Sequence, residues 1–108
     1  MPRRTQPAIS PAALDDLIEQ ATVDCYNESE QVTGLFTMLE EHLDLPFETT
    51  LLRMAVTVTS IDLTDGDQIV AICRRDGQRQ QIPILDLPLP TPARDGCEWI
   101  EAYRRWLR

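Results

Sequence analysis

The chain has 108 residues and a formal net charge of −8, from eighteen acidic residues, ten arginines and no lysine. This length allows one small domain with its own core, and no apolar run approaches the roughly 18 residues of a membrane span, which argues against a membrane-embedded protein. The charge excludes nucleic acid as a default partner, because Lys and Arg bind phosphates, whereas an acidic surface attracts metal ions or basic proteins.

A tail and two helices are expected in the first part of the chain. Residues 1–9 carry no apolar stretch behind their arginines, which indicates a flexible tail and no secretory signal peptide. Ser10 and Pro11 are typical of a helix start, as the N-cap and the first helical residue. Asn27, with a glutamate three residues later, predicts the start of a second helix, which ends by Leu45–Phe47.

The middle of the chain has the composition of β-strands. Val56 and Val58 alternate with threonines, and a break near Arg53-Met54 divides the segment 49–63 into two expected strands. Asp65-Gly66 and Asp76-Gly77 are typical of tight turns between antiparallel strands. We therefore expect two further strands, over 68–74 and 80–87, with Pro83 indicating an edge position for the last.

A proline-rich connector, 87–92, separates the strands from a final helix. Asp95 is the expected N-cap of this helix, since Glu98 follows three residues later. Three aromatic residues then recur at helical spacing and are expected to close the core: Trp99, Tyr103 and Trp106.

Together these elements predict one α+β domain over 10–108. It would contain two N-terminal helices, a curved antiparallel sheet of about four strands and a C-terminal helix. The short strands and tight turns allow the sheet to curl into a small barrel-like form.

The residue types of common catalytic and zinc sites are scarce. Cys25, Cys73 and Cys97 lack the paired spacing of a zinc site, His42 is the only histidine, and three unpaired thiols suit a reducing cytoplasm. Cys73 lies in an apolar run and is expected to be buried. No phosphate-binding glycine loop or hydrolase motif is present, so we expect a protein that is not an enzyme.

Two acidic clusters lie at the ends of the second predicted helix. Asp24 and Glu28 lie near its start, one helical turn apart if helix extends that far, and helix capping already explains acids there. Glu40, Glu41 and Asp44 crowd its C-terminal end, where the helix dipole is already negative. A bound cation would offset the repulsion in this second cluster.

A third acidic cluster, Asp62, Asp65 and Asp67, lies at the first Asp-Gly turn. It resembles the beginning of an EF-hand loop, but glycine falls at position 5 instead of 6 and no glutamate or helix follows at the required place. A plain turn would need only Asp65-Gly66. The additional carboxylates therefore predict a calcium ligand set of another kind, and we rank this cluster first, the Glu40 cluster second and the Asp24 pair third.

Several stretches of the chain resemble the CcbP-type calcium-binding proteins described from cyanobacteria. The resemblance preserves order and spacing over roughly residues 24–108. It implies a small, acidic, bacterial protein that binds Ca²⁺ without EF-hands and buffers or senses it. The matching stretches are Asp24–Tyr26 with Glu28 and Glu30, Gly34–Glu41, Leu45–Phe47, Ile69–Arg75, Ile82–Pro90 and Trp99–Trp106.

Calcium binding by clustered surface carboxylates is therefore the leading functional hypothesis. One cluster cannot supply the six to eight oxygens that Ca²⁺ takes, so carbonyls, waters or another cluster must complete the shell. The alternative is an acidic protein–protein interaction module without metal, in which the helices meet a basic partner and Trp and Tyr side chains act as anchors.

Overall fold

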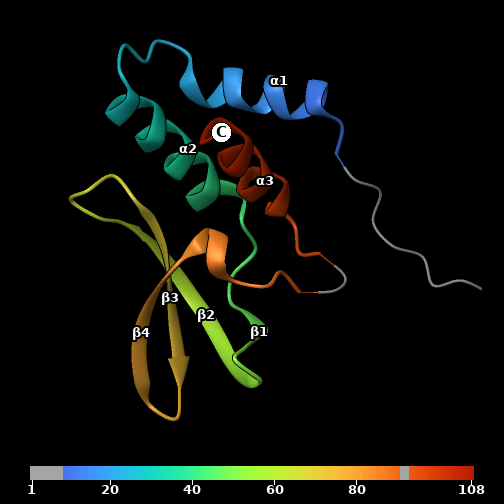
Figure 1. The fold of residues 1–108 in the computed structure, drawn as a ribbon, viewed down its shortest axis with the longest axis vertical. Coiled ribbons are helices and arrows are strands. Elements are labelled where there is room, and N and C mark those ends of the chain that lie inside the picture. The colour runs from blue at the N-terminus through green and yellow to red at the C-terminus, as the bar shows by residue number, and fades with distance from the viewer. Residues whose placement is uncertain (1–8, 91–92) are drawn as a thin grey trace, which may run out of the picture.

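Three α-helices and a four-stranded antiparallel sheet form the fold in the computed structural model, which describes residues 9–90 and 93–108 (Figure 1). Within these ranges no helix has the length and apolar character needed to cross a membrane. The α+β class predicted from the sequence is confirmed. The elements in chain order are α1 (Pro11–Thr22), α2 (Glu28–His42), β1 (Phe47–Leu51), β2 (Met54–Leu63), β3 (Ile69–Arg75), β4 (Gln78–Pro83), the short 3₁₀ helix η1 (Ile84–Asp86) and α3 (Cys97–Trp106).

The first two helices begin at the predicted caps. The Ser10 hydroxyl accepts a hydrogen bond from the backbone N–H of Ala13 at 3.1 Å, and the Asn27 side chain accepts one from Glu30 at 2.8 Å. The Glu30 carboxylate in turn accepts from the backbone N–H of Tyr26 at 2.8 Å. The first two bonds satisfy amides that a helix start leaves without partners, and the third joins the residue before the cap to the first turn of α2. The expected tail, 1–9, lies almost wholly outside the described residues.

The four strands follow one another in the order β1-β2-β3-β4 as an antiparallel meander. Both residues of the β3–β4 turn, Asp76 and Gly77, have positive φ (51° and 78°), as the tight hairpin turn predicted there requires. Leu52 and Arg53 form the β1–β2 turn in the same way, at 51° and 65°. A register shift between Val58 and Ser60 marks a bulge in β2.

The sheet is open, so its closure into a barrel-like form is a wrong prediction. Among the described residues β1 pairs only with β2 and β4 only with β3, which leaves both as edge strands. β4 ends at Pro83, which has no N–H to donate to a further strand, and the chain then turns into η1. The observed strand therefore ends at Pro83, earlier than the predicted end at residue 87. The predicted edge position of Pro83 is confirmed.

The start of α3 differs from the prediction. Gly96, not Asp95, is the N-cap residue, with a φ of 91°, and its backbone N–H donates to the Glu98 carboxylate at 3.1 Å. A left-handed residue at this position favours glycine, and a Cβ there would overlap the carbonyl oxygen of His42. The turn before α3 therefore abuts the end of α2. Residues 91–92 of the predicted connector lie outside the described residues.

The core lies between the helices and β2–β3, and α3 closes it. Trp99 and Tyr103 are each only 4% exposed, and the partly buried Trp106 donates from its indole N–H to the Gln31 side chain at 2.8 Å. Cys73, predicted to be buried, is 1% exposed. The most deeply buried side chains come from α2, β2, β3, η1 and α3: Val32, Leu35, Leu39, Val58, Ile69, Cys73, Ile84 and Ile100.

An ion pair on the surface joins the first and last helices. The Arg105 guanidinium makes a bidentate contact with the Asp15 carboxylate, donating two hydrogen bonds of 2.7 and 3.2 Å. This hydrogen bonding holds the pKa of the Asp15 carboxyl below its ordinary value and raises that of Arg105. Because both groups are solvent-exposed, the pair contributes orientation between α1 and α3 more than stability.

Candidate calcium site

The turn between β2 and β3 carries the first-ranked acidic cluster, and its own hydrogen bonds fix its backbone. The Thr64 N–H donates to the Gln68 carbonyl at 2.9 Å, and the Asp67 N–H donates to the Thr64 carbonyl at 3.0 Å. The Thr64 hydroxyl also accepts from the Gln68 N–H at 3.1 Å. Asp67 itself has a φ of 60°. The turn is therefore closed at its base and presents Asp65 and Asp67 at its tip.

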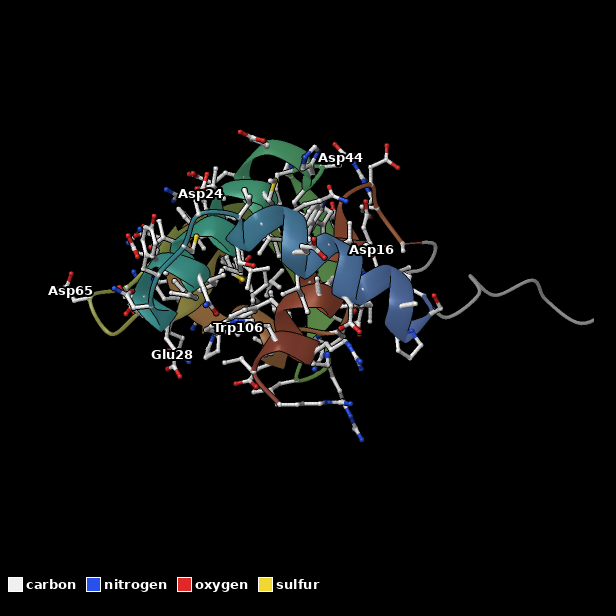
Figure 2. All side chains as sticks on the ribbon, turned by 90° about the horizontal axis from the view of Figure 1, so that it is seen from above. Asp16, Asp24, Glu28, Asp44, Asp65 and Trp106 are labelled. Atoms are coloured by element: carbon white, nitrogen blue, oxygen red, sulfur yellow. The ribbon has the colours of Figure 1, made fainter. Side chains whose placement is uncertain are left out.

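All three carboxylates of this cluster are exposed. Asp62 lies near the end of β2, where its carboxylate accepts a hydrogen bond from the backbone N–H of Leu63 at 2.8 Å. Figure 2 shows Asp65 at the outer tip of its loop, at one extreme of the molecule. Among the described residues, no ion pair involves Asp62, Asp65 or Asp67. Strand β3 follows the turn directly.

The second-ranked cluster lies at the end of α2, and an arginine partly neutralises it. Asp44 lies two residues beyond the end of α2 and accepts from the Nε and Nη2 atoms of Arg94 at 3.0 and 2.7 Å. Its backbone N–H donates to the Asp95 carbonyl at 2.8 Å. The guanidinium supplies a positive charge at the place where the sequence predicted a bound cation. Glu40 and Glu41 are exposed on the last turn of α2.

The imidazole beside this second cluster is held by an aromatic contact. His42 stacks on the indole of Trp99, with ring centroids 5.6 Å apart and planes 12° from parallel. The His42 Nε2 atom lies 3.9 Å from the Glu41 carboxylate. The stacked ring links the end of α2 to the core through α3, so the position of the cluster depends on the packing of Trp99.

The third-ranked pair does not lie on a common helix. α1 ends at Thr22 and α2 begins at Glu28, and Asp24 lies between them with a φ of 62°. Helix does not extend back from Glu28 to Asp24, so the condition under which the two would lie one helical turn apart is not met. α1 has already ended at Thr22, and the left-handed backbone at Asp24 lies in the connection between α1 and α2.

The three clusters occupy two ends of the molecule. Figure 2 shows Asp65 and Glu28 toward one end and Asp44 toward the other, and Figure 1 shows the β2–β3 turn and the start of α2 on the same side. Within 9–90 and 93–108, no three Asp, Glu, His or Cys side chains lie close enough to hold a metal ion. The carboxylates are suitable donors for calcium, but they do not form a ready-made ligand set in this conformation.

Sequence reasoning missed one residue of these surroundings, Arg94. It lies 50 residues from Asp44 in the chain, in the segment before α3, and no local pattern connects the two. Only the contact between the end of α2 and the turn before α3 brings the guanidinium to the carboxylate.

Comparison with known proteins identifies the family. The model of the CcbP family, described as calcium binding, matches residues 15–107, which include all three helices apart from the start of α1, the whole sheet and all three acidic clusters. No curated protein and no solved structure matches the chain. The family description makes Ca²⁺ the ligand, in agreement with the surplus of exposed carboxylates. The match spans well over half of the chain, which therefore belongs to the CcbP calcium-binding family.

Proposed function

We propose that the protein is a calcium buffer without EF-hands, with its principal site at the β2–β3 turn, and that it has no catalytic activity. One observation carries the proposal. Asp62, Asp65 and Asp67 are three exposed carboxylates around a single turn, and no basic side chain among the described residues pairs with them. Three like charges on one turn repel one another in the calcium-free protein, and a divalent cation would reduce that repulsion.

The other two clusters are weaker candidates for electrostatic reasons. Asp44 already has Arg94 as its partner, so a calcium ion there would have to compete with a guanidinium. Glu28 lies in the first turn of α2, where the positive end of the helix dipole stabilises an anion and disfavours a bound cation. Glu40 and Glu41 lie at the negative end of the same helix and are compatible with a secondary, weaker ion.

The turn favours buffering over sensing. Asp62, Asp65 and Asp67 would hold the ion, with backbone carbonyls and waters completing the shell of six to eight oxygens. Because these side chains are exposed and do not converge beforehand, their ordering reduces the affinity. We expect a dissociation constant on the order of 10⁻⁴ M, comparable to the weaker calcium modules. A strand instead of a helix follows the turn, so the helix-pair opening of EF-hand sensors has no counterpart here.

Calorimetric titration of matched double variants at fixed ionic strength tests the proposed site. Asp65→Asn with Asp67→Asn removes two charges and retains the turn, because asparagine also tolerates the positive φ of position 67. The control, Asp16→Asn with Glu19→Gln, removes the same charge from the exposed surface of α1, where neither residue takes part in a described ion pair. We expect the turn variant to lose about tenfold or more in calcium affinity and the control less than twofold.

A third double variant distinguishes a site at the β2–β3 turn from one at the end of α2 and from diffuse surface charge. Glu40→Gln with Glu41→Gln should weaken calcium binding only slightly. If this pair loses the affinity instead, the principal site lies at the end of α2 and the assignment to the turn is wrong. Equal losses in all three variants would mean that the ion responds only to diffuse surface charge, and the absence of saturable heat in the unmodified protein would refute calcium buffering itself.

A further inference from the structure

The end of the sheet farthest from the helices carries two adjoining hollows. Figure 1 shows the β1–β2 and β3–β4 turns extending away from the helices, and both hollows lie between these turns. The larger has a volume of about 590 Å³ and the smaller about 190 Å³. They share three lining residues, Met54, Arg75 and Asp76, and so form one continuous surface.

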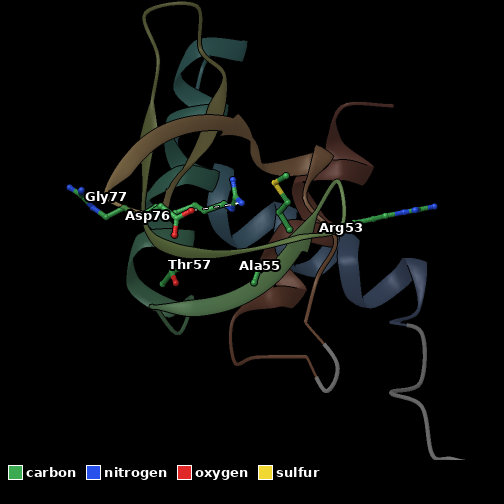
Figure 3. A pocket seen from close by; sticks show the side chains of 8 residues that line it. Arg53, Ala55, Thr57, Asp76 and Gly77 are labelled. Atoms are coloured by element: carbon green, nitrogen blue, oxygen red, sulfur yellow. Dashed lines mark ion pairs between the residues drawn. The ribbon is translucent and has the colours of Figure 1, made fainter.

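The two hollows differ in chemistry because strand side chains alternate between faces. Ala55 and Thr57 line the larger hollow on the face of β2 opposite to the buried Val56 and Val58. Figure 3 shows this hollow between Arg53 and Asp76, with Ala55 and Thr57 between them. The smaller hollow is lined on the other face by apolar residues of the β1–β2 turn and by glutamines of β4.

This surface has the opposite charge to the rest of the molecule. Its two hairpin turns and the adjoining strand ends, 51–59 and 73–80, carry four arginines and one aspartate, a net of three positive charges in a chain of −8. The aspartate, Asp76, is 3.8 Å from the Nη2 atom of Arg75, in an exposed and long ion pair. We call this surface the basic hairpin end; it consists of Arg53, Arg74, Arg75 and Arg79 with Leu52 and Met54 between them.

Two of these arginines face each other without a counter-charge. Arg74 and Arg79 are directly opposite in the β3–β4 ladder, where like charges are destabilising. Across the sheet, Arg74 pairs with Thr57 of β2, and Thr57 pairs with Glu48 of β1. Glu48 is therefore the acidic residue in this row of cross-strand partners. Neither Arg74 nor Arg79 takes part in a described ion pair. A bound carboxylate between them would remove the repulsion.

Large apolar side chains stand exposed beside these charges. Leu52 is 87% and Met54 46% exposed, at the β1–β2 turn next to Arg53. Apolar area that is rimmed by arginines is typical of an interaction surface, since arginine and methionine are enriched at interfaces.

We propose that the basic hairpin end binds an acidic segment of a partner protein that also carries an apolar side chain. The carboxylates of the segment would meet Arg74, Arg79 and Arg53, and its apolar residue would lie on Met54 and Leu52. This partner has the opposite charge to the basic partner that the overall composition suggested.

The dimensions of the surface favour a short protein segment over other polyanions. A duplex or an anionic membrane extends beyond four arginines and would meet the acidic remainder of the chain, which carries seventeen of the eighteen acidic residues. A duplex also offers no apolar group for the hollow beside Leu52, and the acyl chains of a bilayer lie beneath its headgroups and not beside the charges that the arginines would meet. A second copy of this chain would supply carboxylates, and its association is an outcome of the test.

Fluorescence anisotropy with a labelled peptide of four aspartates around a central leucine tests the proposal. We expect saturable binding that weakens about tenfold in Arg74→Gln, which loses one charge-assisted contact. The same variant should melt at an equal or higher temperature, because it also removes the repulsion from Arg79. Arg108→Gln, at the other end of the molecule, is the matched control and should change the affinity less than twofold.

Four binding results would overturn the proposal. They are absence of peptide binding to the unmodified protein, equal weakening by Arg108→Gln, undiminished binding when the central leucine is replaced by serine, and tighter Arg74-dependent binding to duplex DNA or phosphatidylserine vesicles. Sedimentation without peptide completes the test: a dimer that Arg74→Gln dissociates would assign the surface to a second copy, whereas a monomer supports the proposed partner.

Discussion

Alanine at Gly96 tests the contact that joins the end of α2 to the start of α3. Gly96 has a φ of 91°, and an added Cβ would overlap the His42 carbonyl oxygen and the Leu43 Cα. Both are backbone atoms, so a change of rotamer cannot relieve the overlap. Gly77 is the matched control, because it has a similar φ of 78° but nothing within 4 Å of an added Cβ.

The two substitutions differ in whether the added Cβ meets neighbouring backbone, which it does at Gly96 and does not at Gly77. A left-handed backbone costs a non-glycine residue about 1–2 kcal/mol, and this is the expected loss for Gly77→Ala. Gly96→Ala adds the cost of forcing apart packed backbone, about 1–3 kcal/mol, for a total of about 2–5 kcal/mol. At about 5 °C per kcal/mol for a domain of this size, the melting temperature should fall by about 5–10 °C for Gly77→Ala and about 10–25 °C for Gly96→Ala.

Thermal unfolding followed by circular dichroism, with urea unfolding as a second measure, gives both values. The Gly96→Ala protein should also lose the Asp44–Arg94 pair, since that pair depends on the same approach. Equal destabilisation by the two variants would refute the reasoning, because it would leave only the backbone conformation and no contribution from the contact with α2.

Three further outcomes are expected. Trp99→Ala should destabilise the protein by about 3–5 kcal/mol in urea unfolding, because the indole is 4% exposed; a loss below 1 kcal/mol would place it outside the core. Cys25 should react with a thiol reagent at pH 8 well before Cys73 and Cys97, since burial raises the pKa of the latter two thiols; simultaneous reaction of all three would contradict their burial. Calcium at a hundred times its dissociation constant should stabilise the fold by about 2.7 kcal/mol at fixed ionic strength, and magnesium by less. An unchanged melting temperature would mean that calcium does not bind the folded state in preference to the unfolded state.

Local sequence signals predicted those parts of the fold that local interactions determine. Asn27 begins α2 because its side chain bonds an amide three residues away, and Asp76-Gly77 turns because both residues tolerate positive φ. The prediction of Asp95 as a cap failed because the approach of α2 imposes a left-handed residue, which selects Gly96. The prediction of a barrel-like sheet failed for a similar reason, because whether β1 pairs with β4 depends on the tertiary geometry and not on local sequence.

Some features of the candidate site could likewise be predicted from local sequence, and others depend on tertiary contacts. The excess of aspartates at the β2–β3 turn is visible in the sequence, because a turn needs only Asp65-Gly66. The partner of Asp44 was not predictable, because Arg94 reaches it only through folding. The left-handed backbone at Asp24 was also not predictable, since a single such residue between two helices leaves no periodic pattern in the sequence.

Amide chemical shifts followed by NMR during a calcium titration test the central claim most directly. Calcium binding at the β2–β3 turn predicts saturable shifts concentrated in the amides of 62–68, with magnesium at equal ionic strength producing smaller ones. Shifts concentrated in 40–44 instead, or shifts that spread evenly over the acidic surface and rise without saturation, would contradict a calcium site at this turn.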